Sequence, residues 1–363
     1  MMRLAALIER FEPALHARYG EQLTGDMRRA LFALRRCRDE DAPHWLSGCP
    51  GCAAICALPQ SCGHRACPHC QHDSGAQWLQ RQQQRRLPVD YFLVTFTLPA
   101  QLRGVARCHP RRVYAALLRC AWECLARFGR NDPKLAVDLG ATAVLHTHSR
   151  RRDYHPHVHL VVPGGGVNLR TGLWRQKGKY LFNAGNLATV FRAKLLDALR
   201  AEGLTLPAQV PTQWVVDCRA VGSGEAALGY LARYLYRGVL SEADILDCVE
   251  GQVRFRYRDG QTGETRTRRL DGADFLWLLL QHVLPKGFHR ARDFGLLHHK
   301  RKALLQRLQL LLRMAIRPLQ ATPKRPLRCP HCGTPMRTIA TRLPAAAARA
   351  RVRPAQADRS PIM

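Results

Sequence analysis

The chain has 363 residues, of which 46% are hydrophobic, so it is long enough for two or three domains and a sizeable core. Its 57 lysines and arginines against 27 aspartates and glutamates give a formal net charge of +30, and only eight of the 57 are lysines. This excess of arginine over acids predicts a polyanionic partner, most simply nucleic acid, and the lack of any run of about 18 apolar residues argues against a membrane-spanning helix.

Residues 1–36 have the spacing of one or two amphipathic helices that end in basic residues. The first twenty residues, MMRLAALIERFEPALHARYG, include acidic side chains and lack the continuous apolar core of a signal peptide. We therefore expect a cytoplasmic protein, associated with the nucleoid when it binds DNA. Thiols stay reduced in that compartment, so the 14 cysteines are expected to bind metal rather than to form disulfides.

Residues 44–71 are dense in cysteine, glycine and proline and are predicted to be rich in loops. Two Cys-x2-Cys pairs separated by fourteen residues match the spacing of a four-cysteine structural zinc site. The predicted ligands are Cys49, Cys52, Cys67 and Cys70. Further donors in the same segment are Cys56, Cys62, His64 and His69, so another ligand set, with Cys62 in it, or a second ion stays open. Buried cysteines without a metal are the alternative interpretation.

The middle of the chain alternates between strand and helix patterns. A polar helix, QWLQRQQQRRLP, closes the cysteine-rich segment, and Pro88 is a natural boundary after it. The strands are expected at residues 90–99, 141–148, 155–163 and 212–221, and the helices at 109–129, 186–202 and 224–238. Together they predict an α+β fold in which an antiparallel sheet is flanked by helices.

The stretch HPHVHLVV, residues 155–162, places three histidines at alternate positions of one expected strand. Residues two apart point to the same side of a strand, so His155, His157 and His159 would line one face. Histidine is the commonest metal ligand, which favours a metal site. The alternative is the polar face of an edge strand with histidines that bind nothing.

The two strands at 141–148 and 155–163 are predicted to pair as a hairpin around SRRRDY. Centred there, the pairing sets His148 opposite His155, His146 opposite His157, and Val144 opposite His159. Opposed side chains on one sheet face lie about 5 Å apart at Cβ, which is close enough to share an ion. The predicted ligands of a divalent cation are His146, His157 and His159, with positions left open for substrate.

The helix GYLARYLYRG carries two tyrosines four residues apart, Tyr230 and Tyr234, which therefore lie on one helical face. A phenol can act as a covalent nucleophile, and a nearby cation makes a phosphodiester easier to attack. Arg233 and Arg237 add positive charge for phosphate binding. Two core tyrosines on an amphipathic helix are the alternative, and the histidines and the net charge favour the catalytic interpretation.

The last third of the chain is predicted to hold a hairpin near residues 253–270 and two further helices. Cys329 and Cys332 are half of a metal site without an evident second half, and the tail after residue 338 is predicted to be disordered. The expected units are the helices and zinc module at 1–87, the nuclease core at 88–240, a hairpin and helices at 241–325, and the Cys-x2-Cys pair with a basic tail at 326–363.

These motifs together resemble the rolling-circle transposases of insertion-sequence family 91, which carry an HUH (His-hydrophobic-His) nuclease domain. The resemblance covers roughly residues 40–335 and rests on SCGHRACPHCQ, YHPHVHLVVPGGG, YLARYLYR and HVLPKGFHRARDFGLL. It implies that His157 and His159 bind Mg²⁺ or Mn²⁺ and that Tyr230 and Tyr234 are nucleophiles. It also implies a nick that leaves a 5′-phosphotyrosine and a free 3′-hydroxyl. The motif does not fix a third metal ligand, so His146 depends on the pairing argument.

Three other functions fit parts of this pattern. A histidine-triad nucleotide hydrolase fits the histidines alone and needs neither the tyrosines, the zinc module nor the net charge. A replication initiator or relaxase would share the same chemistry, and a zinc-containing DNA-binding protein without catalysis would share the charge. The expected partner is DNA, preferentially the single-stranded ends of a mobile element and its target, and the sequence does not indicate an oligomeric state.

Overall fold

The core of the protein is a five-stranded antiparallel sheet. The computed structural model describes residues 3–70, 72–168, 170–178, 181–236, 239–260, 262–314 and 326–354. The sheet has the order β12-β4-β5-β3-β8, with β3 at Tyr91–Thr97, β4 at Gly140–His148, β5 at Tyr154–Pro163, β8 at Val216–Ala220 and β12 at Ala291–Gly295. The predicted α+β fold is confirmed. Because β5 is the central strand, the interpretation of its histidines as the polar face of an edge strand is wrong.

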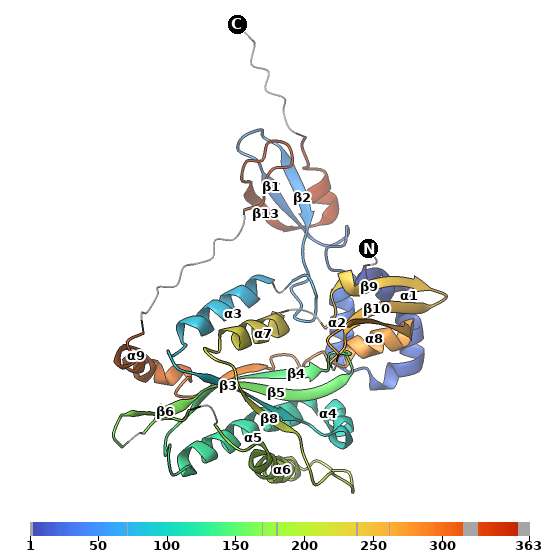
Figure 1. The fold of residues 1–363 in the computed structure, drawn as a ribbon. Coiled ribbons are helices and arrows are strands. Elements are labelled where there is room, and N and C mark those ends of the chain that lie inside the picture. The colour runs from blue at the N-terminus through green and yellow to red at the C-terminus, as the bar shows by residue number, and fades with distance from the viewer. Residues whose placement is uncertain are drawn as a thin grey trace.

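Helices cover both faces of this sheet (Figure 1). One face packs against α4 (Arg103–Cys108), α5 (Pro110–Asn131) and α6 (Ala184–Ala201) in the largest apolar cluster of the molecule. The other face packs against α3 (His72–Gln84) and α7 (Glu225–Tyr236). Both faces of the sheet are buried, so the central strands carry apolar side chains on both sides. The histidines of β4 and β5 lie on the face that α7 covers.

The pairing of β4 with β5 fixes which side chains face one another. His146 lies opposite His157 and Val144 opposite His159, as the sequence predicted. The predicted pairing of His148 with His155 is wrong, because an irregularity between His146 and His148 sets His148 opposite Tyr154. The reason is the tight turn that joins the strands, in which Arg152 adopts a left-handed backbone with φ of 72°.

The N-terminal helices share an apolar cluster with a distant part of the chain. The helices α1 (Leu4–Tyr19) and α2 (Gly25–Arg35) pack with β9 (Ile245–Val249), β10 (Gln252–Arg258), β11 (Thr265–Asp271) and α8 (Gly272–Leu280). The approach is close, since a Cβ atom added at Gly272 would lie 2.3 Å from the ring of Phe11. The beginning of the expected first unit and the beginning of the expected third unit therefore pack together around one apolar cluster.

A second, smaller sheet stands apart from the body of the molecule (Figure 1). It has the order β13-β1-β2, with β1 at His44–Gly48, β2 at Ile55–Pro59 and β13 at Arg337–Leu343, and α10 (Ala345–Arg349) follows. The prediction of disorder after residue 338 is wrong as far as residue 354, because backbone pairing with β1 orders the strand. Residues 355–363 of that tail lie outside the described part of the chain.

The remaining elements are short or peripheral. They are β6 (Gly165–Val167), β7 (Trp174–Gln176), α9 (Lys302–Leu311) and four 3-10 turns at Gly20–Gln22, Ala100–Leu102, Glu242–Asp244 and His299–Arg301. The helix α9 packs with Leu87 and Leu296 beside the sheet. Within the described ranges, none of the helices combines the length and the apolar character needed to cross a lipid bilayer.

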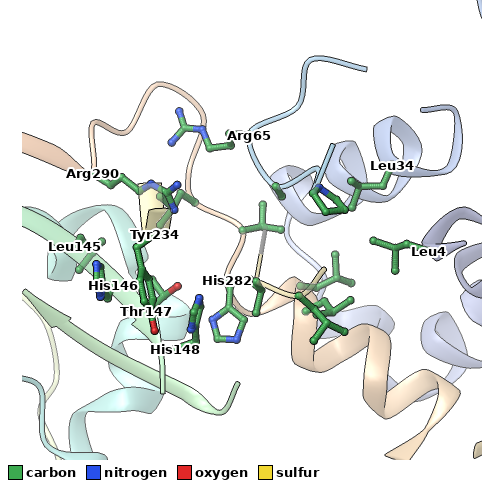
Figure 2. Close-up of a pocket in the computed structure, with 18 residues that line it drawn as sticks. Leu4, Leu34, Arg65, Leu145, His146, Thr147, His148, Tyr234, His282 and Arg290 are labelled. Carbon is green, nitrogen blue, oxygen red and sulfur yellow. The ribbon is translucent and has the colours of Figure 1, made fainter. Parts of the chain in front are cut away.

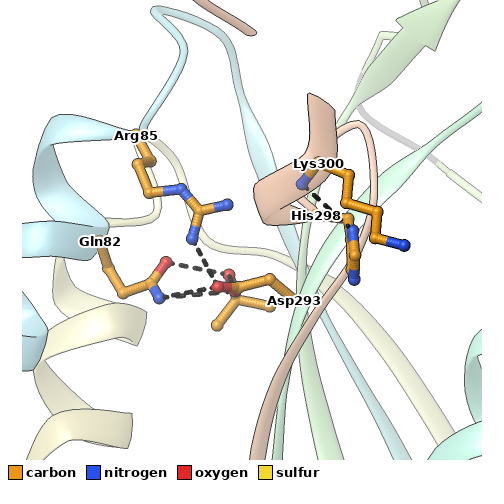
Figure 3. A network of polar contacts seen from close by, with 6 residues as sticks. Gln82, Arg85, Asp293, His298 and Lys300 are labelled. Carbon is orange, nitrogen blue, oxygen red and sulfur yellow. Dashed lines mark hydrogen bonds and ion pairs between the residues drawn. The ribbon is translucent and has the colours of Figure 1, made fainter. Parts of the chain in front are cut away.

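A polar network fastens α3 to the sheet (Figure 3). The carboxylate of Asp293 on β12 accepts hydrogen bonds from the amide of Gln82 on α3 and from the guanidinium of Arg85, which directly follows that helix. The hydroxyl of Thr142 on β4 donates to the same carboxylate at 2.7 Å. Because α3 packs against α7, this network also contributes to the position of the tyrosine helix.

We predict that Asp293→Ala lowers the free energy of unfolding by about 2 kcal/mol, because it leaves three partly buried donors without their shared acceptor. Urea titration followed by circular dichroism measures this change. The control is Asp217→Ala, which removes an exposed ion pair with Arg219 on β8 and should change stability by less than about 0.5 kcal/mol. Equal effects of the two substitutions would show that the network contributes nothing.

Candidate active site and cysteine clusters

Three histidines converge on the sheet face that α7 covers. His146 lies on β4, and His157 and His159 lie on β5. One ring nitrogen of each histidine lies within 4.8 Å of a ring nitrogen of the other two. The rings of His146 and His159 are 4.4 Å apart at their centroids, and those of His157 and His159 are 4.8 Å apart. The structure thus brings together all three residues predicted to hold a divalent cation.

The hydrogen bonds of these histidines leave nitrogen atoms available for a metal. The Nδ1 of His157 donates to the carbonyl oxygen of His155 at 2.7 Å, so its Nε2 keeps a lone pair. The Nδ1 of His159 is hydrogen bonded to Thr95 Oγ1 at 2.8 Å. The buried Nε2 of His159 and both ring nitrogens of His146 have no hydrogen-bond partner within the described structure. Buried nitrogens without partners are costly, so this donor set fits a divalent cation.

Burial keeps the three imidazoles neutral at neutral pH, which is the form that binds metal. Burial, followed by the neighbouring histidines, holds the pKa of His146 well below its usual range. The same two causes lower the pKa of His159, and burial lowers the pKa of His157 to about 4. Only 3% of the surface of His146 is exposed.

The two tyrosines of α7 lie directly beside the histidines. The ring of Tyr234 stacks on that of His146, with centroids 3.9 Å apart and planes 7° from parallel. The ring of Tyr230 lies 5.9 Å from the rings of both His146 and His159, and the two tyrosines are 5.1 Å apart. The predicted shared helical face is therefore confirmed. Burial, then the neighbouring Tyr234, raises the pKa of the Tyr230 hydroxyl.

Apolar packing sets the position of these tyrosines. The helix α7 buries five apolar side chains in the cluster with α3 and the sheet, namely Ala227, Leu228, Leu231, Ala232 and Leu235. The sequence spacing of the apolar and tyrosine residues therefore decides which face of the helix meets the histidines.

An open pocket of about 470 Å³ lies over the tyrosines. Its lining residues are Pro68, His148, Arg152, Tyr230, Arg233, Tyr234, Val239, Leu240, Ser241 and Asp244. The exposed Arg233 was predicted to bind DNA and does line the pocket, whereas Arg237 lies outside the described residues. Sequence reasoning missed Arg152, whose buried Nε has no partner in the described structure and whose left-handed backbone has no sequence signal.

Two further buried histidines extend the site beyond the three convergent histidines. Figure 2 shows the rings of Tyr234, His148 and His282 next to one another. The centroids of Tyr234 and His148 are 4.9 Å apart, and those of His148 and His282 are 5.2 Å apart. The Nε2 of His282 donates to the carbonyl oxygen of Arg152 at 2.9 Å and so supports the turn beside the pocket. No motif in the sequence around His282 predicts a place in the site, and the folding of the chain puts it there.

The cysteines predicted as one zinc site belong to two separate clusters. The first cluster consists of Cys37, Cys62, Cys67 and Cys70, and the second of Cys49, Cys52, Cys329 and Cys332. In each cluster the four sulfur atoms lie within 4.8 Å of one another. The prediction of Cys49, Cys52, Cys67 and Cys70 as one ligand set therefore does not match the structure, and Cys62 does join Cys67 and Cys70. Because Cys37 and the C-terminal pair lie far away in sequence, spacing alone did not reveal them.

The first cysteine cluster lies close to the pocket. Pro68, between Cys67 and Cys70, lines both the open pocket and the narrow cavity shown in Figure 2. Arg65 of the same loop donates to the carbonyl oxygen of Phe288 at 2.8 Å. The loop that carries this cluster is thus one wall of the site.

The buried His282 should make stability depend on pH. Burial lowers its pKa in the folded protein to about 4, whereas an unfolded histidine titrates near 6.5. Below pH 6.5 the unfolded chain therefore binds a proton that the folded protein does not, and stability falls by up to about 3 kcal/mol as the pH drops to about 4.

We predict that His282→Gln, which keeps a donor for the Arg152 carbonyl, makes the loss of unfolding free energy between pH 6.5 and 4 shallower than in the wild type. Denaturant titrations at a series of pH values measure the slopes. The exposed His289→Gln is the control and should retain the wild-type slope. Parallel slopes for all three proteins would contradict the assignment.

Comparison with known proteins identifies the family of this chain. Residues 140–303 match the family model described as "Putative transposase", and residues 7–98 match the "Transposase zinc-binding domain" of insertion-sequence family 91. The "Putative transposase y4qJ" of Sinorhizobium fredii is 30% identical over 338 residues, covering 86% of this chain and 85% of that protein. The "Transposase for insertion sequence element IS801" of Pseudomonas savastanoi pv. phaseolicola is 27% identical, covering 71% of this chain and 66% of that protein.

Solved structures show a more distant likeness. The conjugative relaxase TrwC in complex with oriT DNA, in a metal-bound structure, is 16% identical, with a TM-score of 0.28 over 61% of this chain and 72% of that chain. The metal-free structure of the same complex has a TM-score of 0.26. The two family models match residues 7–98 and 140–303, and the relative from Sinorhizobium fredii aligns with 86% of the chain. The chain therefore belongs to the rolling-circle transposases of insertion-sequence family 91.

Proposed function

We propose that this transposase cuts and rejoins single DNA strands by tyrosine attack, with a divalent cation held by His146, His157 and His159. The observation that carries the proposal is the convergence of these three histidines with Tyr230 and Tyr234. The two tyrosines also line one open pocket. The family resemblance implies Mg²⁺ or Mn²⁺ as this cation, and open coordination positions would be filled by oxygen atoms of the substrate or water. When bound, the cation polarises the phosphodiester and makes its phosphorus easier to attack.

The chemical step that follows is a phosphoryl transfer to a phenol. The tyrosine oxygen forms a bond to phosphorus while the bond between phosphorus and the 3′-oxygen breaks. The phenol gives up its proton and the departing 3′-oxygen gains one, so the products are a 5′-phosphotyrosine and a free 3′-hydroxyl. Attack of a 3′-hydroxyl on the phosphotyrosine reverses the step and joins a strand.

A pair of tyrosines 5.1 Å apart suits two successive transfers. One phenol holds the first 5′-end while the other remains available for a second strand. Stacking on His146 orients the ring of Tyr234, and partial burial restrains Tyr230. The raised pKa of Tyr230 means that its hydroxyl keeps its proton until the transfer begins.

Arginines around the pocket are proposed to bind the phosphates of the substrate strand. Arg152 and Arg233 line the pocket, and the sequence adds Arg237 directly after Tyr236. A planar guanidinium makes forked contacts with phosphate oxygens, and the net charge of +30 attracts DNA over longer distances. We infer a preference for single strands, because a phenol fixed on a helix needs an unpaired, accessible phosphodiester. Such a protein acts in the cytoplasm on DNA of the nucleoid.

The zinc-binding domain is proposed to hold a structural Zn²⁺ through the first cysteine cluster, Cys37, Cys62, Cys67 and Cys70. Four convergent sulfur atoms form the usual environment of structural zinc. The ion would stabilise the loop that forms one wall of the pocket. We also propose that residues 88–240 form most of the nuclease core and that β12 completes its sheet, with 1–87 and the rest of 241–325 packed beside it.

We predict that Tyr230→Phe and Tyr234→Phe each leave one active phenol, so that each variant retains some cleavage of a labelled single strand but fails to complete transposition. The double variant should form no covalent adduct, because phenylalanine keeps the ring packing and removes the attacking oxygen. A denaturing gel of strands from the ends of the element, incubated with Mg²⁺ or Mn²⁺, detects the protein-linked product.

The matched control is Tyr257→Phe on β10, outside the pocket, which should retain wild-type adduct formation. His157→Ala should abolish cleavage while circular dichroism shows an intact fold. A covalent band from the double variant, or a wild-type product that is never linked to protein, would overturn the tyrosine mechanism and favour a DNA-binding protein without this chemistry.

We predict that Arg233→Ala weakens binding to single-stranded DNA and makes its salt dependence shallower. Each neutralised phosphate contributes a slope of about −0.7 to the logarithm of affinity against the logarithm of salt concentration for single strands, so one lost contact reduces the slope by about 0.7. Fluorescence anisotropy at several salt concentrations measures both effects. Arg200→Ala, on α6 at the opposite sheet face, is the control and should behave as wild type. An unchanged slope for Arg233→Ala would exclude a phosphate contact.

A further inference from the structure

The second cysteine cluster joins the two ends of the protein. Cys49 and Cys52 follow β1, whereas Cys329 and Cys332 precede β13. The Sγ atoms of Cys49 and Cys332, 283 residues apart in sequence, lie 3.4 Å from each other, and those of Cys52 and Cys329 lie 3.6 Å apart. Both matched family regions, residues 7–98 and 140–303, exclude the C-terminal pair.

The two cysteine pairs occupy two copies of the same turn. Both read Cys-Pro-x-Cys, and in both the first cysteine amide donates to the carbonyl five residues later, at 2.8 Å for Cys49 and 2.9 Å for Cys329. In both, the residue after the second cysteine has a left-handed backbone, with φ of 54° at Ala53 and 71° at Gly333. Alanine adopts that conformation at an energetic cost, so a further interaction must stabilise the first turn.

The turns face each other at close range. A Cβ atom added at Gly51 would lie 2.8 Å from Thr334 Oγ1 and 3.5 Å from Cys332 Sγ, so only glycine allows this approach. In a tetrahedral zinc site with Zn–S bonds of 2.3 Å, the sulfur atoms are about 3.8 Å apart. The distances between the paired sulfur atoms are close to that value.

Apolar burial around the sulfur atoms is too small to hold the turns together. The buried cluster at this point consists, among the described residues, of Cys49, Ala54, Cys329 and Met336, and two of these are the cysteines themselves. A module with so small a core needs a metal or cross-links to be stable. Bringing together segments more than 270 residues apart also carries the entropic cost of closing a long loop.

We propose that Cys49, Cys52, Cys329 and Cys332 bind a second structural Zn²⁺, which fastens the C-terminal strand β13 to β1. The site is separate from the proposed zinc of the first cluster and from the nuclease pocket. It makes the last described segment, residues 326–354, part of the zinc module rather than a free tail. The inference does not depend on the tyrosine chemistry.

The test counts zinc in the full-length protein, purified without chelator, by elemental analysis. We expect Cys332→Ser to hold one zinc ion fewer per chain than the wild type, as should Cys67→Ser, which disrupts the first cluster. Cys108→Ser, whose exposed cysteine belongs to neither cluster, should hold as many as the wild type. A difference between proteins is independent of any zinc that the three histidines take up. Equal zinc contents in Cys332→Ser and the wild type would overturn the second site.

Alkylation of the native wild-type protein keeps the proposal testable if a serine variant does not fold. Cys332 is exposed, so burial does not protect it, and only a bound metal would slow its reaction with iodoacetamide relative to the exposed Cys108. We expect protection of Cys332 that is lost on adding a chelator. Labelling of Cys332 as fast as Cys108, or protection that survives chelator and disappears with reductant, as a disulfide would give, refutes the site. The covalent protein–DNA adduct is measured in a separate assay. Loss of the adduct in a protein that keeps its structural zinc would refute the nuclease proposal and leave the second zinc site unaffected.

Discussion

The antiparallel pairing of β4 with β5 is the interaction on which the site depends. It sets His146 opposite His157, and the strand alternation then puts His159 on the same face. A shift of the register by one residue would turn His146 away from the other two. The register is secured because the intervening positions, including Leu145, Val158 and Leu160, bury their side chains against the helices on the opposite face.

Burial gives these histidines their chemical character. In the centre of a sheet covered on both faces, the imidazoles lose their charged form and keep nitrogen atoms without hydrogen-bond partners. Buried nitrogen atoms without partners destabilise the folded protein, and a bound cation would offset this cost. The tyrosine helix contributes to the same burial, since the ring of Tyr234 covers His146, so the proposed nucleophile and the proposed metal site stabilise each other's geometry.

Segments far apart in the sequence surround the histidines and tyrosines and form the walls of the site. The loop of the first cysteine cluster contributes Pro68, the hairpin turn contributes Arg152, and the segment after α8 contributes His282 behind the tyrosine. The N-terminal helices pack with α8 and the hairpin before it. The zinc-binding part and the nuclease part of this transposase therefore share one site wall instead of being joined only by a linker.

The sequence by itself determined the main elements around the site and its candidate residues, because periodic patterns and short spacings are local properties. Alternation identified the strand of His157 and His159, helical spacing put Tyr230 and Tyr234 on one face, and hairpin pairing added His146. Only the tertiary structure decided the division of the cysteines, the order in the C-terminal strand, and the places of His282 and Arg152. Each of these depends on contacts between segments far apart in sequence, or on a backbone conformation without a residue signature, such as the left-handed Arg152. Local spacing carries no information about such contacts, since packing of the whole chain selects them.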